Sequence, residues 1–194
     1  MTTRALQLAV IASATVLVIL GTHAGAYEVA THEELSRQGF RKSGVAGRLG
    51  AFGLTSVQKL RGRLLSLRQQ PRTPEVWVTI GGGDEDLPPN RVLNHFYDPH
   101  YDVSLTFSLG GAKAPDWALE DAGDLAGQNH SYKDARQAFY DGLTLASRTS
   151  RERELGHTFY ALGHVIHLIQ DLTVAEHTRD DLHLFIGWDA SLFE

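Results

Sequence analysis

The sequence predicts an all-α protein, a single multi-helix domain in which roughly four to six helices surround a cleft, with little or no sheet. Three observations support this prediction. The chain has 194 residues, of which 42% are hydrophobic and 21% are charged, and this length and apolar content suit one globular domain. Apolar residues recur at helical spacing through the C-terminal half, and capping-box pairs precede several of these stretches. No repeat, low-complexity tract or clear linker divides the chain.

The first 26 residues are predicted to be an export signal peptide. Arg4 gives a positive start, an almost wholly apolar run follows, and Ala24-Gly25-Ala26 offers small residues for cleavage. The run is about 15 residues long, shorter than the roughly 20 that a membrane span needs, although an uncleaved anchor is the alternative. We therefore expect a secreted or periplasmic protein whose mature helical domain, residues 27–194, begins at Tyr27.

Two helical stretches are expected in the N-terminal half. Thr31 and Glu34 have capping-box spacing and open a predicted helix over residues 32–43, which the glycines that follow would end. A second helical stretch is predicted to start at Thr55 or Ser56, because apolar residues follow at helical spacing. These residues are Val57, Leu60, Leu64 and Leu67.

The middle of the chain is less regular. Residues 75–80 form a short and partly β-branched run, so strand and helix both stay open, and Gly81-Gly82-Gly83 is expected to end either one. Residues 84–99 hold three of the six prolines together with several acids, a composition typical of an irregular loop. Loops of this kind often carry functional residues.

Three further helices are predicted in the C-terminal half, over residues 116–126, 131–146 and 149–172. The second and third of these helices follow pairs with capping-box spacing, Ser131 with Asp134 and Thr149 with Glu152.

Composition limits the classes of function. The formal net charge of −5 gives no electrostatic reason to expect a stable nucleic-acid partner, since such proteins favour basic faces. The chain has ten histidines and no cysteine, so disulfides and thiolate zinc fingers are excluded. A metal site would have to be built from imidazole and carboxylate groups.

The most informative pattern lies near the end of the longest predicted helix. His167 and Asp171 are four residues apart and project from one face of that helix, and His177 follows six residues later, where a turn would fold it back. Imidazole nitrogen and carboxylate oxygen suit zinc, although manganese or iron stays open. The alternative is a set of ordinary helix residues, but apolar neighbours surround the pair, and buried polar groups need partners. His164 is expected to pack beside the ligands.

A second element, His95-Phe96-Tyr97-Asp98-Pro99, carries a resemblance. It resembles the His-Phe-aromatic-Asp-Pro stretch of the bacterial zinc-dependent phospholipases C, and residues 162–177 are similar to the His-x3-Asp-x5-His helix and turn of the same family. These enzymes share an all-α fold with fungal zinc-dependent, single-strand-specific nucleases. The resemblance therefore implies a cluster of two or three zinc ions in a cleft between helices.

The resemblance also implies ligands. One zinc would be held by His95, His167 and Asp171 with an acid from the preceding loop, for which Asp86 is the first choice and Asp84 the reserve. The neighbouring zinc would take Asp171 as a bridge, together with the ligands His32 and, through its amino group and carbonyl oxygen, Tyr27.

A third zinc would be held by His177 with a histidine and an acid near the C-terminus. Glu194 matches the acid, but Ala190 stands where the family has the histidine, and His183 is the remaining candidate. The sequence stops at Glu194, so a shortened family member or a fragment is expected, and the third site is either rearranged or weakened.

The implied activity is phosphodiester hydrolysis of the phospholipase C type, with a phospholipid substrate and peripheral membrane contact. A metal-bound hydroxide would attack phosphorus, and Asp86 would be the catalytic residue that orients or deprotonates the water. A nuclease or nucleotidase is the alternative within enzymes and would need an aromatic platform for a base, for which Phe96, Tyr97, Tyr101 and Trp117 are candidates. A non-catalytic, degenerate zinc-binding domain is the alternative outside enzymes.

Overall fold

The structure is a computed structural model that describes residues 29–62, 70–87, 89–104, 111–119, 125 and 127–179. The predicted signal peptide and the candidate residues Tyr27, His183, Ala190 and Glu194 lie outside the described residues. Within the described ranges the regular structure is helical, and the only extended pairing consists of isolated bridges. The prediction of an all-α, multi-helix class is confirmed.

The helices differ widely in length. The elements in chain order are α2 (Val29–Lys42), α3 (Val45–Arg48), the 3-10 helix η1 (Leu49–Phe52), α4 (Pro74–Asp84), α5 (Pro89–Val92), α6 (Ala114–Leu119), α7 (Tyr132–Thr144), α8 (Arg148–Asp171) and α9 (Ala175–Thr178).

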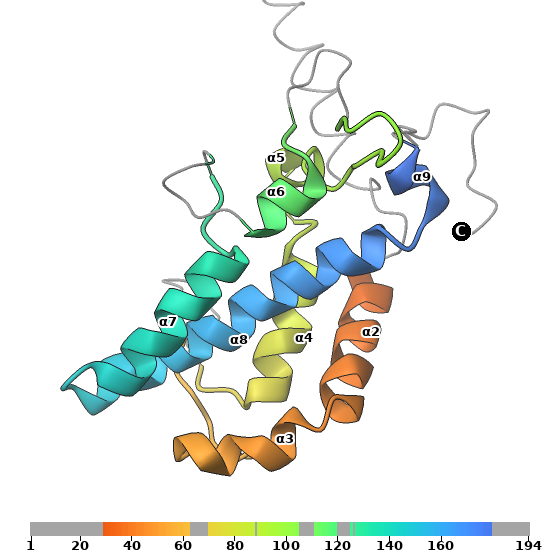
Figure 1. Cartoon of the computed structure of the whole chain (residues 1–194). Helices are drawn as coiled ribbons and strands as arrows, with labels where there is room; N and C mark the ends of the chain where they lie inside the picture. Colours follow the sequence, from red (N-terminus) through yellow and green to blue (C-terminus); the bar gives the residue numbers. More distant parts are fainter. Residues whose placement is uncertain are drawn as a thin grey trace, which may run out of the picture.

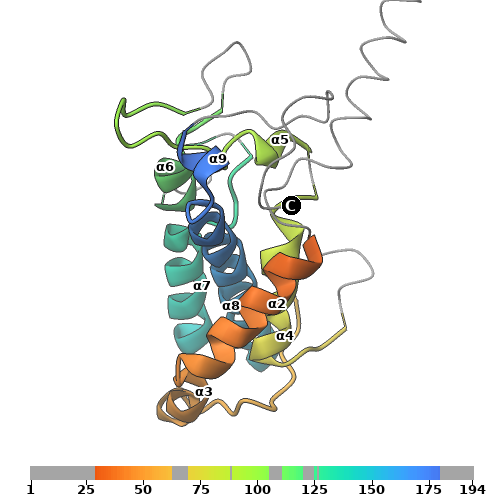
Figure 2. The same cartoon turned by 90° about the vertical axis from the view of Figure 1, so that its right-hand side faces the viewer.

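Helix α8 is the axis of the fold. It has 24 residues, which gives it a length of about 36 Å. Helix α7 packs along one side of α8, α4 packs along another, and α2 lies against α4 (Figure 1). The view turned by 90° shows the same neighbours, with α5, α6 and α9 gathered around the end where α8 finishes (Figure 2). The C-terminal end of α8 is therefore the place where these three short helices meet.

The contact between α4 and α8 depends on glycine. A Cβ atom on Gly163 would lie 2.3 Å from the carbonyl oxygen of Val78, and one on Gly81 would lie 2.1 Å from the carbonyl oxygen of Tyr160. The expectation that the three glycines end their element is wrong, because α4 continues through them to Asp84. Glycine costs helix stability, but here the absence of side chains lets two helix backbones come close.

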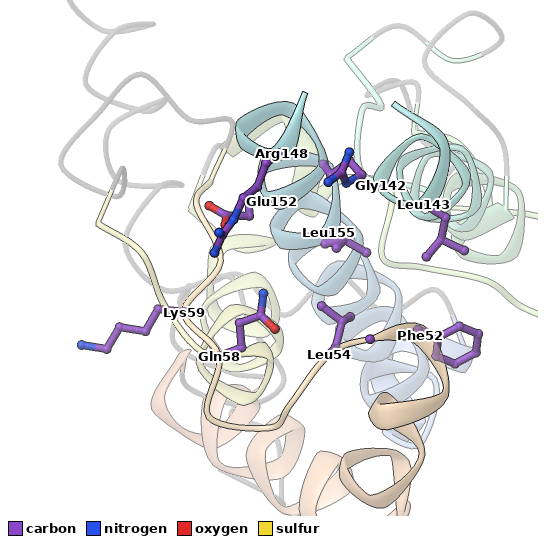
Figure 3. Close-up of a pocket in the computed structure, with 11 residues that line it drawn as sticks. Phe52, Leu54, Gln58, Lys59, Gly142, Leu143, Arg148, Glu152 and Leu155 are labelled. Atoms are coloured by element: carbon purple, nitrogen blue, oxygen red, sulfur yellow. The ribbon is translucent and has the colours of Figure 1, made fainter. Parts of the chain in front are cut away.

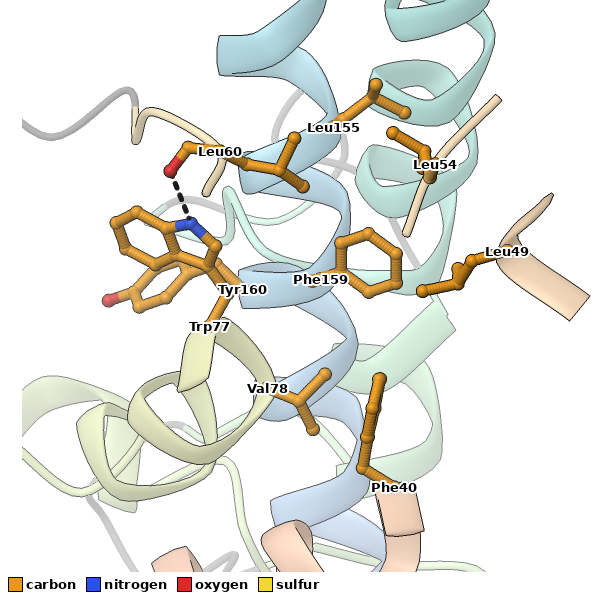
Figure 4. Packing of buried hydrophobic residues seen from close by; sticks show 9 residues of the cluster. All are labelled: Phe40, Leu49, Leu54, Leu60, Trp77, Val78, Leu155, Phe159 and Tyr160. Atoms are coloured by element: carbon orange, nitrogen blue, oxygen red, sulfur yellow. Dashed lines mark hydrogen bonds between the residues drawn. The ribbon is translucent and has the colours of Figure 1, made fainter. Parts of the chain in front are cut away.

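The apolar core lies at the other end of α8. Phe159 of α8 points toward Phe40 and Leu49, and its ring meets that of Phe40 edge to face at 6.5 Å (Figure 4). Trp77 of α4 is 1% exposed, and its Nε1 donates to the carbonyl oxygen of Leu60 at 2.9 Å. This core fixes the relative positions of α2, α4 and α8 and so supports the opposite end.

Residues 55–62 are not helical, so the helix predicted to begin at Thr55 or Ser56 is wrong over its described part. Leu60 forms an isolated antiparallel bridge with Arg72, and its side chain is 0% exposed. The apolar spacing favours one face of a helix, but Leu60 enters the core from an extended segment. Tertiary packing here overrides the local pattern.

Helix starts both match and differ from their predictions. Helix α2 already includes Val29, so the predicted start near His32 with Thr31 as its cap is wrong. Ser131 caps α7 in a capping box with Asp134, as predicted. Helix α8 instead starts at Arg148 and is capped by Ser147, whose side chain accepts from the backbone N–H of Ser150. The predicted Thr149 cap is wrong by two residues, since both hydroxyl residues fit the preference for a cap and only the chain path selects one.

Among the described helices, none is both long enough and apolar enough to span a bilayer.

Candidate metal centre

Six candidate ligands converge at the end of α8. They come from separate parts of the chain: His32 from α2, Asp86 from the turn after α4, His95 from the turn after α5, His167 and Asp171 from α8, and His177 from α9. The four histidines are each 0% exposed, and Asp171 is 1% exposed. Residues as far apart as 32 and 177 therefore share one buried site.

Asp171 lies at the centre of this group. Its Oδ1 is 3.3 Å from Nε2 of His32, and its Oδ2 is 2.8 Å from Nδ1 of His95 and 3.1 Å from Nε2 of His167. Its Oδ2 is also 3.7 Å from Nδ1 of His177. Asp171 is the last residue of α8, where the helix dipole favours positive charge.

Asp86 also lies close to two of these histidines. Its Oδ1 lies 3.4 Å from Nε2 of His167 and 3.6 Å from Nδ1 of His95. Two sets of ligand atoms are close enough to surround an ion, namely His32, His167 and Asp171, and Asp86, His95 and His167. His167 belongs to both sets, so the two positions are neighbours.

One ring nitrogen, Nδ1, of each of three histidines is held by a neutral oxygen. Nδ1 of His32 donates to Oε1 of Gln170 at 2.7 Å, and Nδ1 of His167 donates to the carbonyl oxygen of Gly82 at 2.7 Å. Nδ1 of His177 donates to the carbonyl oxygen of His95 at 3.0 Å. A carbonyl oxygen only accepts, so it places the proton on Nδ1 and leaves Nε2 as the nitrogen for a metal.

The charges at the site are strongly coupled. Burial lowers the pKa of His95, but the nearby carboxylates of Asp171 and Glu85 outweigh burial and raise the pKa to about 9. Burial likewise opposes the charge of His167, yet Asp171 and Asp86 hold its pKa well above the ordinary value. Without a metal, protons on these imidazoles therefore balance the carboxylates.

The buried side-chain atoms at the site that lack hydrogen bonds fit a bound metal ion. Within the described residues, no hydrogen bond of normal geometry reaches either ring nitrogen of His95, Nε2 of His167, Oδ1 of Asp86 or either carboxylate oxygen of Asp171. Buried polar atoms rarely stay unpaired, because desolvation costs free energy. Imidazole and carboxylate atoms that face one another in this way are the donor set of a divalent cation, and zinc suits them.

The structure adds a residue that the sequence did not single out. Glu85 is 0% exposed, and its carboxylate accepts from Arg91, Trp117 and His164. Burial opposes ionisation, but the contacts with His164, His95 and Arg91 hold the pKa of Glu85 well below the ordinary value. In the sequence Glu85 is one of three consecutive acids, and only the fold separates their roles.

Three other residues singled out in the sequence, Asp84, Phe96 and Trp117, lie outside both ligand sets. Asp84, the reserve acid, accepts from the hydroxyl of Tyr160 at 2.8 Å and belongs to neither ligand set. Phe96 is 2% exposed and stacks on His177 with ring centroids 4.6 Å apart. Trp117 is 2% exposed. These two aromatic rings are part of the packing around the site, so neither offers an open face to a nucleic-acid base.

A pocket of about 600 Å³ lies elsewhere on the molecule (Figure 3). It is lined near the start of α8 by Arg148, Arg151 and Glu152, and none of the six candidate ligands that the structure describes borders it. Glu152 and His167 are fifteen residues apart on one helix, which places this pocket about 22 Å from the candidate metal centre.

Comparisons of the chain with models of protein families, with curated proteins and with solved structures gave no match. The case for function therefore rests on the site itself.

Proposed function

We propose that this protein is an exported, zinc-dependent phosphodiester hydrolase that acts on phospholipid headgroups in the manner of a phospholipase C. The observation that carries the proposal is the buried cluster in which the two oxygens of Asp171 face His32 and His95, which belong to two adjoining ligand sets. Paired divalent ions a few ångströms apart are a recurring device for phosphodiester cleavage.

The proposal assigns a role to the zinc ions, to Asp171 and to Asp86. Zinc bound at the two sets would neutralise the phosphate and lower the pKa of water into the neutral range. Asp171 would hold both ions together, since its two oxygens face histidines of both sets. Asp86 is 8% exposed, more than the other ligands, and would orient the attacking water and take its proton.

A phospholipid is favoured over a nucleic acid for two reasons. The resemblance of His95-Phe96-Tyr97-Asp98-Pro99 is to the phospholipase branch. Phe96 and Trp117 are buried, which removes two of the four candidate platforms on which a base would stack. Tyr101 is 70% exposed and is the best remaining platform for the alternative, a nuclease or nucleotidase.

The test begins with the metal. Elemental mass spectrometry of the purified protein is expected to give two or three zinc ions per chain, and the double variant His167→Ala, Asp171→Ala is expected to lose them. His100→Ala is the matched control, because His100 is exposed and belongs to neither ligand set. A wild-type protein without metal would remove the basis of the proposal.

The second step is activity. Zinc-loaded protein is expected to release phosphorylated headgroups from phosphatidylcholine vesicles, to lose this activity with a chelator and to regain it with zinc. Faster cleavage of single-stranded DNA than of lipid would favour the nuclease alternative. Bound zinc with no cleavage of either substrate would favour a non-catalytic zinc-binding domain.

A further inference from the structure

Glu85 occupies a position next to the metal centre that the proposed mechanism does not use. It precedes Asp86 in the chain, and its side chain is 0% exposed, but neither ligand set includes it. Its Oε2 accepts from Nε of Arg91 at 2.9 Å and from Nδ1 of His164. Its Oε1 accepts from Nε1 of Trp117 at 2.8 Å.

The same Oε1 atom faces a ligand. It lies 3.6 Å from Nε2 of His95, while Nδ1 of the same ring lies 2.8 Å from Oδ2 of Asp171 and 3.6 Å from Oδ1 of Asp86. The His95 ring therefore spans the distance between the metal centre and Glu85, with one nitrogen directed to each.

His95 differs in this respect from His32 and His167. Those two histidines each place Nδ1 against a neutral oxygen and direct Nε2 toward Asp171, whereas His95 directs Nδ1 toward Asp171 and places Nε2 beside a carboxylate. The inward nitrogen of a ligand must be free of its proton, so the outward nitrogen needs an acceptor that holds the proton.

We propose that Glu85 is a positioning residue that accepts a hydrogen bond from the Nε2–H group of His95. The proton is thereby kept on Nε2, and Nδ1 is fixed as the atom that binds the metal. The inference deepens the proposed function, on whose metal centre it rests. A carboxylate behind a histidine ligand both sets the orientation of the ring and increases its basicity.

Glu85 is held rigidly enough for this role. Arg91, which pairs with it, also donates to the carbonyl oxygen of Gly127 at 3.1 Å and to Oε1 of Gln128 at 3.0 Å. The guanidinium lies over the ring of Trp117 at 4.9 Å from its centroid. Arg91 and Trp117 therefore fix both oxygens of the carboxylate, and the Arg91 charge balances that of Glu85 in the interior.

The test compares two conservative variants, Glu85→Gln and Asp84→Asn. Both replace a buried acid by its amide on adjacent residues, but Asp84 contacts Tyr160 and no ligand set includes it. We expect Glu85→Gln to bind zinc about 10- to 100-fold more weakly in competition with a chelator, and Asp84→Asn to bind it normally. The absorption spectrum of cobalt(II)-loaded Glu85→Gln should also change, because the geometry at His95 changes.

A purely structural role for Glu85 predicts a different result. Glu85→Gln would then lower the melting temperature of the metal-free protein but leave the zinc affinity and cobalt spectrum unchanged, and this outcome would overturn the inference alone. A wild-type protein that binds no metal would overturn the proposed function as well, so the two failures are distinguishable.

Removal of one charge from a buried pair can prevent folding, since Arg91 would be left uncompensated. The double variant Glu85→Gln, Arg91→Met removes both charges, and its zinc affinity should stay low; recovery to the wild-type value would contradict the inference. Nitrogen-15 spectra of histidine-labelled, zinc-loaded wild-type protein provide a test without substitution. They should show the His95 proton on Nε2, and a proton on Nδ1 would overturn the inference.

Discussion

Nδ1 of His167 lies 2.7 Å from the carbonyl oxygen of Gly82, so the histidine shared by both ligand sets is held directly by the backbone of the neighbouring helix. This bond requires α4 and α8 to lie unusually close. A Cβ atom on Gly163 would be 2.7 Å from the backbone nitrogen of Gly82. Helix packing and ligand orientation are therefore coupled.

Gly163→Ala is accordingly expected to damage both stability and metal binding. The added methyl group would meet backbone atoms of α4, which cannot move aside as a flexible side chain can. Overpacking of this kind costs about 1–3 kcal/mol or more. Thermal unfolding and zinc titration would measure the two effects. Gly39→Ala is the matched control, because Gly39 is exposed on α2 and a Cβ there would meet nothing within 4 Å. It should stabilise the helix by up to about 1 kcal/mol, and equal behaviour of the two variants would contradict the close packing.

Gln170→Leu is expected to weaken one of the two ion positions. Oε1 of Gln170 accepts from Nδ1 of His32, and its Nε2 donates to Oγ of Ser36 at 3.2 Å, so leucine would leave the His32 ring without its acceptor. A loss of about 10-fold in affinity for one zinc, with the other retained, is the expected titration result. Gln38→Leu serves as the control, since Gln38 bonds Glu34 on α2 and lies outside both sets. Two zinc ions bound with wild-type affinity in Gln170→Leu would exclude this role.

The sequence predicted the pair His167 and Asp171 but not the position of Glu85. The spacing of His167 and Asp171 is a local property of one helix, and local periodicity predicts which residues share a face. Glu85 could not be singled out, because its partners Arg91 and Trp117 are brought to it only by the fold.

The errors in the predicted helices have a related cause. Three consecutive glycines weaken an isolated helix, yet α4 continues through them because α8 packs against the bare backbone. The apolar spacing after Thr55 predicts a helix face, but Leu60 fills the core from an extended segment. In both places a contact distant in sequence decides the local structure.

The metal-free protein is expected to lose stability as the pH rises. The pKa of His95 is about 9 in the folded chain, against an ordinary value of 6.5, so protonation favours the folded state. This contribution is complete below about pH 6.5 and is lost as the pH rises through about 9, with a size on the order of a few kcal/mol. Melting temperatures in a chelator should therefore be lower at about pH 9 than at about pH 6.

Zinc should reverse this trend. Ligand imidazoles must lose their protons to bind a metal, so the stabilisation by zinc should increase with pH over the same range. Melting curves with excess zinc and with a chelator, recorded across the range, provide the comparison. A metal-free protein whose melting temperature rises toward pH 9 would show that His95 is not protonated in the folded state.

Asp171 gives the sharpest prediction about stoichiometry, because its two oxygens face histidines of both ligand sets. His32 belongs to one ligand set and His95 to the other. His32→Ala and His95→Ala should each lose about one zinc per chain, because each leaves the ligands of the opposite position in place. Asp171→Ala should lose both ions, since it takes a carboxylate oxygen from each position. Elemental mass spectrometry measures the zinc, and far-ultraviolet circular dichroism confirms that each variant is folded. If folded Asp171→Ala retained as much zinc as His32→Ala, the two ions would have to bind without a shared carboxylate.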